Sequence, residues 1–223
     1  MAGHWVDPLL HLPYRPTTQR HPLGSSAKEF LAERAVKYES LAASDYSRQV
    51  DDICSVIVEC LVSERKIIAF GNGGSAALAM HFTGELVGRF LADRAPLPAI
   101  CLSGDTSALT AIGNDYAYEE IFARQIQAHG RAGDVALGLS TSGKSTNIVS
   151  ALNRADALGL VGVAMTGGDG GPASQAAKYA AKVPSNDTGF IQEAHEAALH
   201  FICHRIDEVY TNDLKERKIA LNG

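Results

Sequence analysis

Five short apolar segments recur between residues 67 and 183, and helical patterns separate them. The segments are IIAF at 67–70, PAICL at 98–102, DVALGL at 134–139, LVGVAM at 160–165 and YAAKV at 179–183. Apolar runs that do not alternate with polar residues are typical of strands buried on both faces of a parallel sheet. We therefore expect an α/β fold in which helices cover both sides of such a sheet. In these folds ligands bind where strands end and helices begin.

Helical periodicity accounts for most of the remaining chain. Helices are expected near 75–90, 106–128, 145–158 and 171–178, and a long final helix from about 192 to 214. Residues 26–63 also show a helical pattern, with a break or a new N-cap at Ser44-Asp45. Residues 1–26 are rich in Pro, His and Thr and have no clear period. We expect an N-terminal extension over 1–26 and a single domain over 27–223 that includes the N-terminal helical segment.

The composition of the 223 residues argues against several classes of protein. A net charge of −5 leaves no basic surface for a nucleic-acid backbone. No apolar run reaches the roughly 18 residues of a transmembrane helix, and the first residues show no signal pattern. The four cysteines lie far apart, which indicates core residues in a reducing compartment rather than disulfides or a cysteine zinc site. We expect a cytoplasmic protein with no nucleic-acid or membrane partner.

The segment after the first apolar run, Gly71-Asn72-Gly73-Gly74-Ser75-Ala76, fits the G-x-G-x-x-A pattern of dinucleotide-binding turns. Such sites need an acidic residue about 20 positions further on to hold the ribose. Asp93 lies near that distance, but it sits in a polar segment and not at the end of a second strand. The pattern therefore predicts a turn whose backbone can approach a ligand, and a dinucleotide is disfavoured.

A second nucleotide-like motif, GLSTSGKS at 138–145, formally matches the phosphate loop G-x-x-x-x-G-K-[ST]. Ser140, Thr141 and Ser142 form a hydroxyl cluster, which suits a phosphomonoester held by side chains and helix N-terminal N–H groups. No later strand ends in the Asp that would hold magnesium, because LVGVAM runs into Thr166-Gly167-Gly168. We therefore predict a phosphate-binding turn and disfavour a nucleotide kinase or NTPase.

His81 and Glu85 follow the glycine turn four residues apart, so both lie on one face of the predicted helix. On the final helix, Gln192 and His200 are about two turns apart and can face one pocket, while His200 and His204 form an alternative pair. Two imidazoles, a carboxylate and an amide oxygen suit zinc or another divalent ion. Taken singly, such residues are more often plain helix-face residues than ligands, and the other histidines of the final helix are interpreted in that way. The position behind a ligand-approachable turn favours a metal or acid–base site.

Four motifs, in consistent order over roughly residues 45–212, resemble those of the sugar isomerase (SIS) domain and, within it, of the phosphoheptose isomerase family. They are GNGGSAALAMHFTGEL, IGNDYAYEEIF, GLSTSGKSTNI and IQEAHEAALH. The resemblance implies a three-layer α/β/α sandwich with a five-stranded parallel sheet. It also implies one Zn²⁺ per subunit and a homotetramer with active sites between subunits.

The resemblance further implies roles for individual residues. Substrate would be contacted by residues of three turns and by two residues of the metal set: Asn72, Gly73, Gly74, Asn114, Asp115, Ser140, Thr141, Ser142, Ser145, Glu85 and Gln192. The metal would be held by His81, Glu85, Gln192 and His200. Glu85 and His200 would also be the catalytic acid/base pair.

The implied reaction converts D-sedoheptulose 7-phosphate, a phosphorylated seven-carbon sugar, to D-glycero-D-manno-heptose 7-phosphate through a metal-assisted enediol(ate) mechanism. Moving a proton between C1 and C2 needs a base near the carbon and a group that stabilises the developing oxyanion. The sequence departs from the family pattern at Leu78, Gly84, Lys144 and Phe190. Of these, Leu78 and Phe190 are expected to alter pocket polarity or subunit contacts.

One SIS relative of a different functional class provides the alternative hypothesis. The replication-initiator-associating SIS protein is a non-catalytic binding or interaction module, and the chain resembles it along most of its length. That relative is expected to lack the carboxylate at the position of Glu85 and the imidazole at the position of His200. This chain has both, which favours the enzyme.

Overall fold

The computed structural model describes the backbone of residues 26–221 and the side chains of residues 26–211. The predicted extension over 1–26 falls outside this range except for its last residue. The chain divides into two compact units, residues 1–36 and 37–223. The predicted boundary between an extension and a single domain at 26/27 stays a prediction.

In the first unit, the described residues form the start of helix α1 (Ala27–Ala42). Ser26 and Glu29 cap this helix reciprocally: the Ser26 N–H donates to Glu29 Oε2 at 2.6 Å, and the Glu29 N–H donates to Ser26 Oγ at 3.2 Å. Such a capping box satisfies N–H groups that a helix start leaves without partners. The local sequence is therefore enough to begin the helix.

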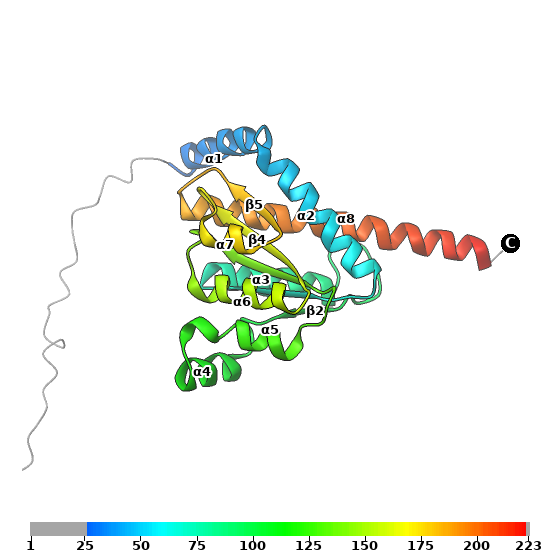
Figure 1. Ribbon diagram of the computed structural model, residues 1–223. Helices are drawn as coiled ribbons and strands as arrows, with labels where there is room; N and C mark the ends of the chain where they lie inside the picture. The colour runs from blue at the N-terminus through cyan, green and yellow to red at the C-terminus, as the bar shows by residue number, and fades with distance from the viewer. Residues whose placement is uncertain (1–25, 222–223) are drawn as a thin grey trace, which may run out of the picture. The chain divides into compact units, whose positions relative to one another are not determined.

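The second unit is built on a five-stranded parallel sheet, as predicted. Its strands are β1 (Ile67–Gly71), β2 (Ala99–Cys101), β3 (Val135–Ser140), β4 (Val161–Gly167) and β5 (Tyr179–Val183), in the order β2-β1-β3-β4-β5 (Figure 1). Gly71 pairs with Leu139, and Ser140 pairs with Thr166. The carboxyl ends of the three central strands therefore meet at one edge, where an open parallel sheet binds ligands.

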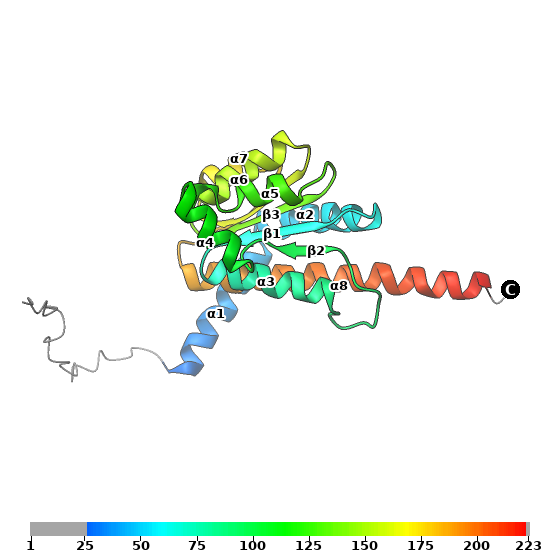
Figure 2. The ribbon, with the colours of Figure 1, turned by 90° about the horizontal axis from the view of Figure 1, so that it is seen from below.

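Helices cover both faces of this sheet, which confirms the three-layer α/β/α architecture. Figure 2 shows α5 (Ala123–His129), α6 (Thr146–Ala157) and α7 (Gly171–Ala176) on one side, and α3 (Gly74–Val87) and α8 (Thr188–Leu221) on the other. Successive side chains of β1 enter opposite cores: Ile67 and Ala69 pack with α3 and α8, whereas Ile68 and Phe70 pack with α5 and α6. This alternation explains why each strand is an unbroken apolar run.

The helices upstream of the sheet agree with the sequence pattern. Helix α2 (Asp45–Val62) begins at the predicted break, where Ser44 Oγ accepts the Tyr46 N–H at 3.2 Å. Its buried face includes Val50, Ile53 and Ile57. Ser44 is therefore the N-cap of a separate helix.

Two predicted helices have different bounds in the structure. The helix expected over 106–128 is wrong as a single element, because it divides into α4 (Thr106–Asp115), a 3₁₀ turn η1 (Tyr118–Glu120) and α5. The break falls where Ala117 is extended, with φ −161° and ψ 158°. Helix α8 begins at Thr188, before the predicted start at 192, because Asp187 Oδ1 accepts the Phe190 N–H and so caps its first turn.

The cysteines belong to the core, as predicted, and all four are free thiols. Cys54, Cys60 and Cys203 are buried, and Cys101 is half-buried. Burial raises the pKa of each thiol, to about 11 for Cys60 and about 12 for Cys203. Within the described part of the chain, none of the helices has both the length and the apolar character that crossing a bilayer requires.

Candidate active site

The glycine turn, residues 71–75, leaves β1 and leads into α3. Gly73 has φ +54°, a conformation that L side chains rarely adopt. A Cβ on Gly74 would lie 2.4 Å from Nε2 of Gln192, so the absence of a side chain there makes room for the Gln192 amide. The turn therefore brings the predicted substrate residues beside a predicted metal ligand from α8.

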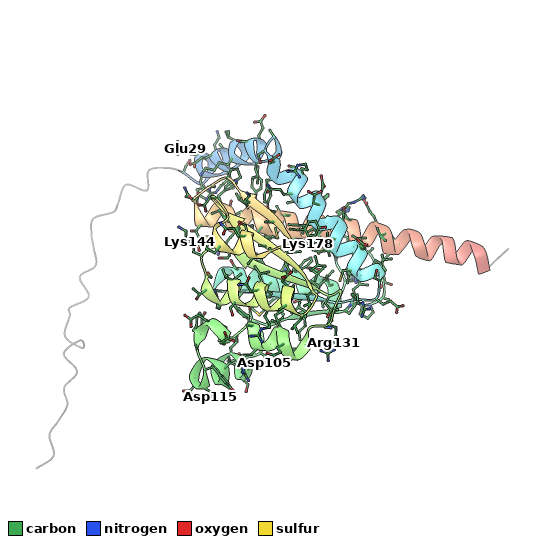
Figure 3. The ribbon with its side chains drawn as sticks, viewed as in Figure 1. Glu29, Asp105, Asp115, Arg131, Lys144 and Lys178 are labelled. Carbon is green, nitrogen blue, oxygen red and sulfur yellow. The ribbon has the colours of Figure 1, made fainter. Side chains whose placement is uncertain are left out.

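The serine turn, residues 140–145, leaves β3 and leads into α6. Ser140 Oγ and Ser145 Oγ lie 3.2 Å apart, and the Lys144 N–H donates to Ser142 Oγ at 3.2 Å. The turn holds its hydroxyls at the N-terminus of a 12-residue helix, where exposed N–H groups and the helix dipole favour an anion. Figure 3 shows Lys144 and Asp115 of α4 toward the same end of the sheet, and Arg131, which precedes β3, toward the other end.

A pair of amides links the two turns. Asn72 Nδ2 donates to Asn147 Oδ1 at 2.9 Å, and Asn147 Nδ2 donates back to Asn72 Oδ1 at 2.9 Å. The Tyr118 hydroxyl donates to the same Asn72 oxygen at 3.1 Å. Asn147 is almost fully buried, so this reciprocal pair satisfies an amide that would otherwise be costly to bury. Sequence reasoning missed both Asn147 and Tyr118, although both lie inside quoted motifs.

Helices α3 and α8, which cover the same face of the sheet, bring predicted metal ligands together. His81 Nε2 on α3 lies 2.9 Å from His200 Nε2 on α8, and 3.6 Å from Glu85 Oε1 one turn along α3. Glu196 of α8 joins His81 and His200 in a group whose ligand atoms all lie within 4.8 Å of one another. Among the four predicted ligands, His81 therefore lies close to both His200 and Glu85, and Gln192 extends the same face of α8 one turn before Glu196.

The donor set fits a divalent ion of the zinc type. Two imidazole nitrogens that approach to 2.9 Å converge on one region, with carboxylates beside them. Imidazole, carboxylate and amide oxygen are borderline to hard ligands, which suits Zn²⁺ and similar ions. Glu196 is a further candidate ligand that is not among the four predicted from the sequence. Its spacing of four from both Gln192 and His200 is the signal that could have identified it.

His195 shows how burial separates structural from functional histidines on one helix. It is fully buried, and its Nε2 lies 3.1 Å from the Thr166 carbonyl oxygen. Burial lowers its pKa to about 4, against the opposing effect of that hydrogen bond. His195 is therefore neutral at physiological pH and anchors α8 to β4, which supports its interpretation as structural.

The predicted turn at Asn114 and Asp115 needs a correction. These residues form the last turn of α4 rather than a separate turn, and both are exposed. Asn114 Nδ2 donates to Asp115 Oδ1 at 2.8 Å. It is Tyr118, three residues after Asp115, that reaches Asn72. The role of Asn114 and Asp115 in substrate binding stays a prediction.

The departures from the family pattern have structural roles. Phe190 is buried and packs edge-on against Tyr38, with ring centroids 5.3 Å apart. Leu78 is half-buried and packs against the core formed with α3 and α8. Both residues contribute apolar packing at these positions.

Comparison with known proteins places this geometry in a family. The family model for the SIS domain matches residues 30–167. The phosphoheptose isomerase of Aquifex aeolicus is 48% identical over 164 residues, which cover 74% of this chain and 86% of that protein. The phosphoheptose isomerase of Aneurinibacillus thermoaerophilus is 45% identical, covering 78% of this chain and 87% of that protein.

Solved structures show the same likeness. The phosphoheptose isomerase of Neisseria gonorrhoeae superposes with a TM-score of 0.76 at 38% identity, covering 81% of this chain and 96% of that chain. The enzyme of Francisella tularensis gives a TM-score of 0.77 at 35% identity, with the same coverage of 81% and 96%. The glycine turn, the serine turn and the helix that carries His81 and Glu85 fall within residues 30–167, which the family model matches. The chain therefore belongs to the SIS-domain family and, within it, to the phosphoheptose isomerases.

Proposed function

We propose that the chain is an aldose–ketose isomerase that converts D-sedoheptulose 7-phosphate to D-glycero-D-manno-heptose 7-phosphate. One observation carries the proposal: His81 lies 2.9 Å from His200 and 3.6 Å from Glu85 on the helix that leaves the glycine turn, and Asn72 and Asn147 join that turn to the hydroxyl-rich turn. Acid/base groups and a candidate anion site therefore lie on directly connected elements. The names of the relatives support the same substrate class.

The reaction moves one proton between two carbons and one between two oxygens. A base takes the proton from C1 of the ketose while an acid protonates the C2 carbonyl oxygen, which gives an enediol. Return of a proton to C2 and loss of the proton on O1 then complete the aldose. We assign these transfers to Glu85 and His200, because both lie beside His81, at 3.6 and 2.9 Å, and come from different helices.

We propose that a zinc ion is held by His81, Glu85, Gln192 and His200, with Glu196 within reach. When bound, the ion supplies a Lewis acid that polarises the carbonyl and offsets negative charge on the substrate oxygens. The protein residues orient the sugar: the Asn72 amide is locked by Asn147 and Tyr118 and presents a fixed polar group at the glycine turn. Preorganised dipoles of this kind cost no reorganisation during the reaction.

We propose that the serine turn binds the 7-phosphate. Hydroxyls of Ser140, Thr141, Ser142 and Ser145 surround the N-terminus of α6. A phosphate there would be held far from the reacting C1–C2 end of the sugar, so its binding energy serves to position that end.

We also propose a cytoplasmic homotetramer with sites at subunit interfaces. Large apolar side chains lie exposed on the two helices that carry the site: Met80 and Val87 on α3 and Phe201 on α8, at 45%, 51% and 39% exposure. Apolar side chains that are exposed in a single subunit and lie beside functional residues mark surfaces that assembly can bury. Sedimentation velocity on the purified protein tests the assembly, and a monomer at micromolar concentration would contradict it.

The decisive experiment incubates purified, metal-analysed protein with sedoheptulose 7-phosphate and follows aldose formation. We expect turnover that chelation abolishes and Zn²⁺ restores. Failure to form product with or without Zn²⁺ would favour the non-catalytic binding module, which phosphosugar binding measured by calorimetry would then support.

A further inference from the structure

A buried ion pair lies beyond the site, between the loop that follows α3 and the far part of α8. Arg94 Nε donates to Asp207 Oδ1 at 3.0 Å, and both side chains are almost fully buried. Burial alone would raise the pKa of Asp207, but the N–H groups of Ala92 and Leu91 and the Arg94 guanidinium hold it below its ordinary value. The carboxylate is therefore charged at neutral pH.

The Arg94 side chain also caps the C-terminal end of α3, the helix that carries His81 and Glu85. Its Nη2 donates to the carbonyl of Glu85 at 2.8 Å, and its Nη1 donates to the carbonyl of Leu86 at 2.9 Å. A helix leaves its last carbonyls without partners, and a cation there also complements the helix dipole. The guanidinium thus fixes the last turn of α3 directly at the backbone of Glu85.

Asp207 fixes the loop between α3 and β2 onto α8. Its Oδ2 accepts the N–H of Leu91 at 2.9 Å and that of Ala92 at 2.8 Å. Figure 2 shows this loop passing beside α8. The residue before Leu91 is Phe90, whose ring stacks on the His200 imidazole with centroids 5.5 Å apart and an interplanar angle of 24°. The anchored loop therefore also contacts His200, which lies seven residues before Asp207 on α8.

We propose that Arg94 and Asp207 are positioning residues that set the placement of α3 against α8, and with it the approach of Glu85 and His200. The pair connects to both catalytic candidates through atoms already described: to Glu85 by a backbone hydrogen bond, and to His200 through the Phe90 ring. Buried ion pairs contribute little net stability over apolar packing, but they constrain geometry because each partner tolerates few arrangements. The inference rests on the proposed isomerase function.

A second buried carboxylate provides a matched control. Asp134 accepts the N–H groups of Lys66 and Arg131 and pairs with the Lys66 ammonium, so it too has two backbone donors and one cationic partner. It lies before β3, at the amino ends of the strands and away from the site. Asp134→Asn removes an equivalent buried charge whose partners, Lys66 and Arg131, lie on neither α3 nor α8. It therefore shows the effect of losing a buried ion pair without any displacement of Glu85 or His200.

The experiment compares Asp207→Asn, Phe90→Leu and Asp134→Asn in the full chain, with Arg94→Lys as a second way to break the clamp if Asp207→Asn does not fold. The first readout is the ¹³Cε1–Hε1 NMR signal of His200, identified among the eight histidines by its loss in His200→Gln. The second is the division of the effect between kcat and KM for sedoheptulose 7-phosphate.

We expect Asp207→Asn to move the His200 signal toward its position in Phe90→Leu and to lower kcat about 10-fold or more, with KM within about twofold. Asp134→Asn should leave the signal and kcat near those of the wild type. An unmoved His200 signal in Asp207→Asn and Arg94→Lys, or equal kcat losses in Asp207→Asn and Asp134→Asn, would overturn the proposal. The NMR readout needs neither turnover nor metal, so an inactive wild type would count against the proposed reaction alone.

Discussion

The glycine turn and the serine turn have the same place in the fold, yet Gly74 of the first and Gly143 of the second make room for different groups. Each turn leaves a central parallel strand and opens a helix. At Gly74 a Cβ would meet the end of a mobile side chain, Gln192. At Gly143 the φ is +64° and a Cβ would lie 2.1 Å from the Gly170 carbonyl oxygen, which is backbone. One glycine makes room for a functional group, whereas the other makes room for the chain itself.

The helices behind the turns differ in a corresponding way. Helix α3 carries His81 and Glu85 to the site, while α6 contributes its N-terminus and hydroxyls. The difference suggests a division between a side that does chemistry and a side that binds. Four variants test that division.

The largest effect is expected for Glu85→Gln on the α3 side. Loss of a general acid/base should lower kcat about 10²–10⁴-fold, because the amide cannot exchange a proton as the carboxylate does. Steady-state kinetics measures the loss, and circular dichroism should show an unchanged fold. Near-normal turnover would remove Glu85 from the chemistry and the division with it.

Gly143→Ala should affect folding rather than chemistry. A left-handed conformation and a clash with the Gly170 backbone together should cost about 3 kcal/mol of unfolding free energy. Urea denaturation measures this. Gly84→Ala is the control, because its Cβ would meet nothing within 4 Å and it lies inside α3, where alanine should stabilise. Equal stability of the two variants would contradict the assignment.

Gly74→Ala should lower activity and leave stability nearly unchanged, which is the opposite of what is expected for Gly143→Ala. The new methyl must displace the Gln192 amide, so kcat/KM should fall about 10–100-fold while stability stays within about 1 kcal/mol of the wild type. Zinc affinity, measured by chelator competition, should fall as well. A stable variant with unchanged kinetics and zinc affinity would show that the Gln192 position does not matter.

Ser142→Ala should have the smallest effect, and on the binding side. Loss of one hydroxyl hydrogen bond, worth about 1 kcal/mol, should raise KM about fivefold and leave kcat nearly unchanged. Inhibition by inorganic phosphate should weaken in parallel. A fall in kcat at constant KM would place the serine turn in the chemistry.

The strands were the most predictable part of the fold. All five lie within two residues of the apolar runs, because strands buried on both faces leave little choice of residue type. The break between α4 and α5 was not evident from the sequence, because apolar residues that pack on one core lie on both sides of it: Leu109 and Ile112 before it, Ile121 and Ile126 after it. An apolar pattern reports burial on each side and does not by itself mark where one helix ends.

The site was predictable where residues lie close in sequence or on one helix face. Spacing showed that His81 and Glu85 share a helix face and that Gln192 and His200 can face one pocket, whereas the choice of these four as a set came from the family resemblance. The Asn72–Asn147 pair spans 75 residues and depends on how far β1 and β3 project at the sheet edge. No local pattern encodes that register, so the link between the two turns required the structure.

The buried cysteines have a consequence for the redox behaviour of the protein. Because burial raises the pKa of all four thiols, very little thiolate is present at neutral pH. Thiolate is the form that alkylating agents and peroxide attack. Native thiols should therefore react slowly, so that a cysteine introduced on an exposed surface away from α3 and α8 can carry a spectroscopic label without removal of the native four.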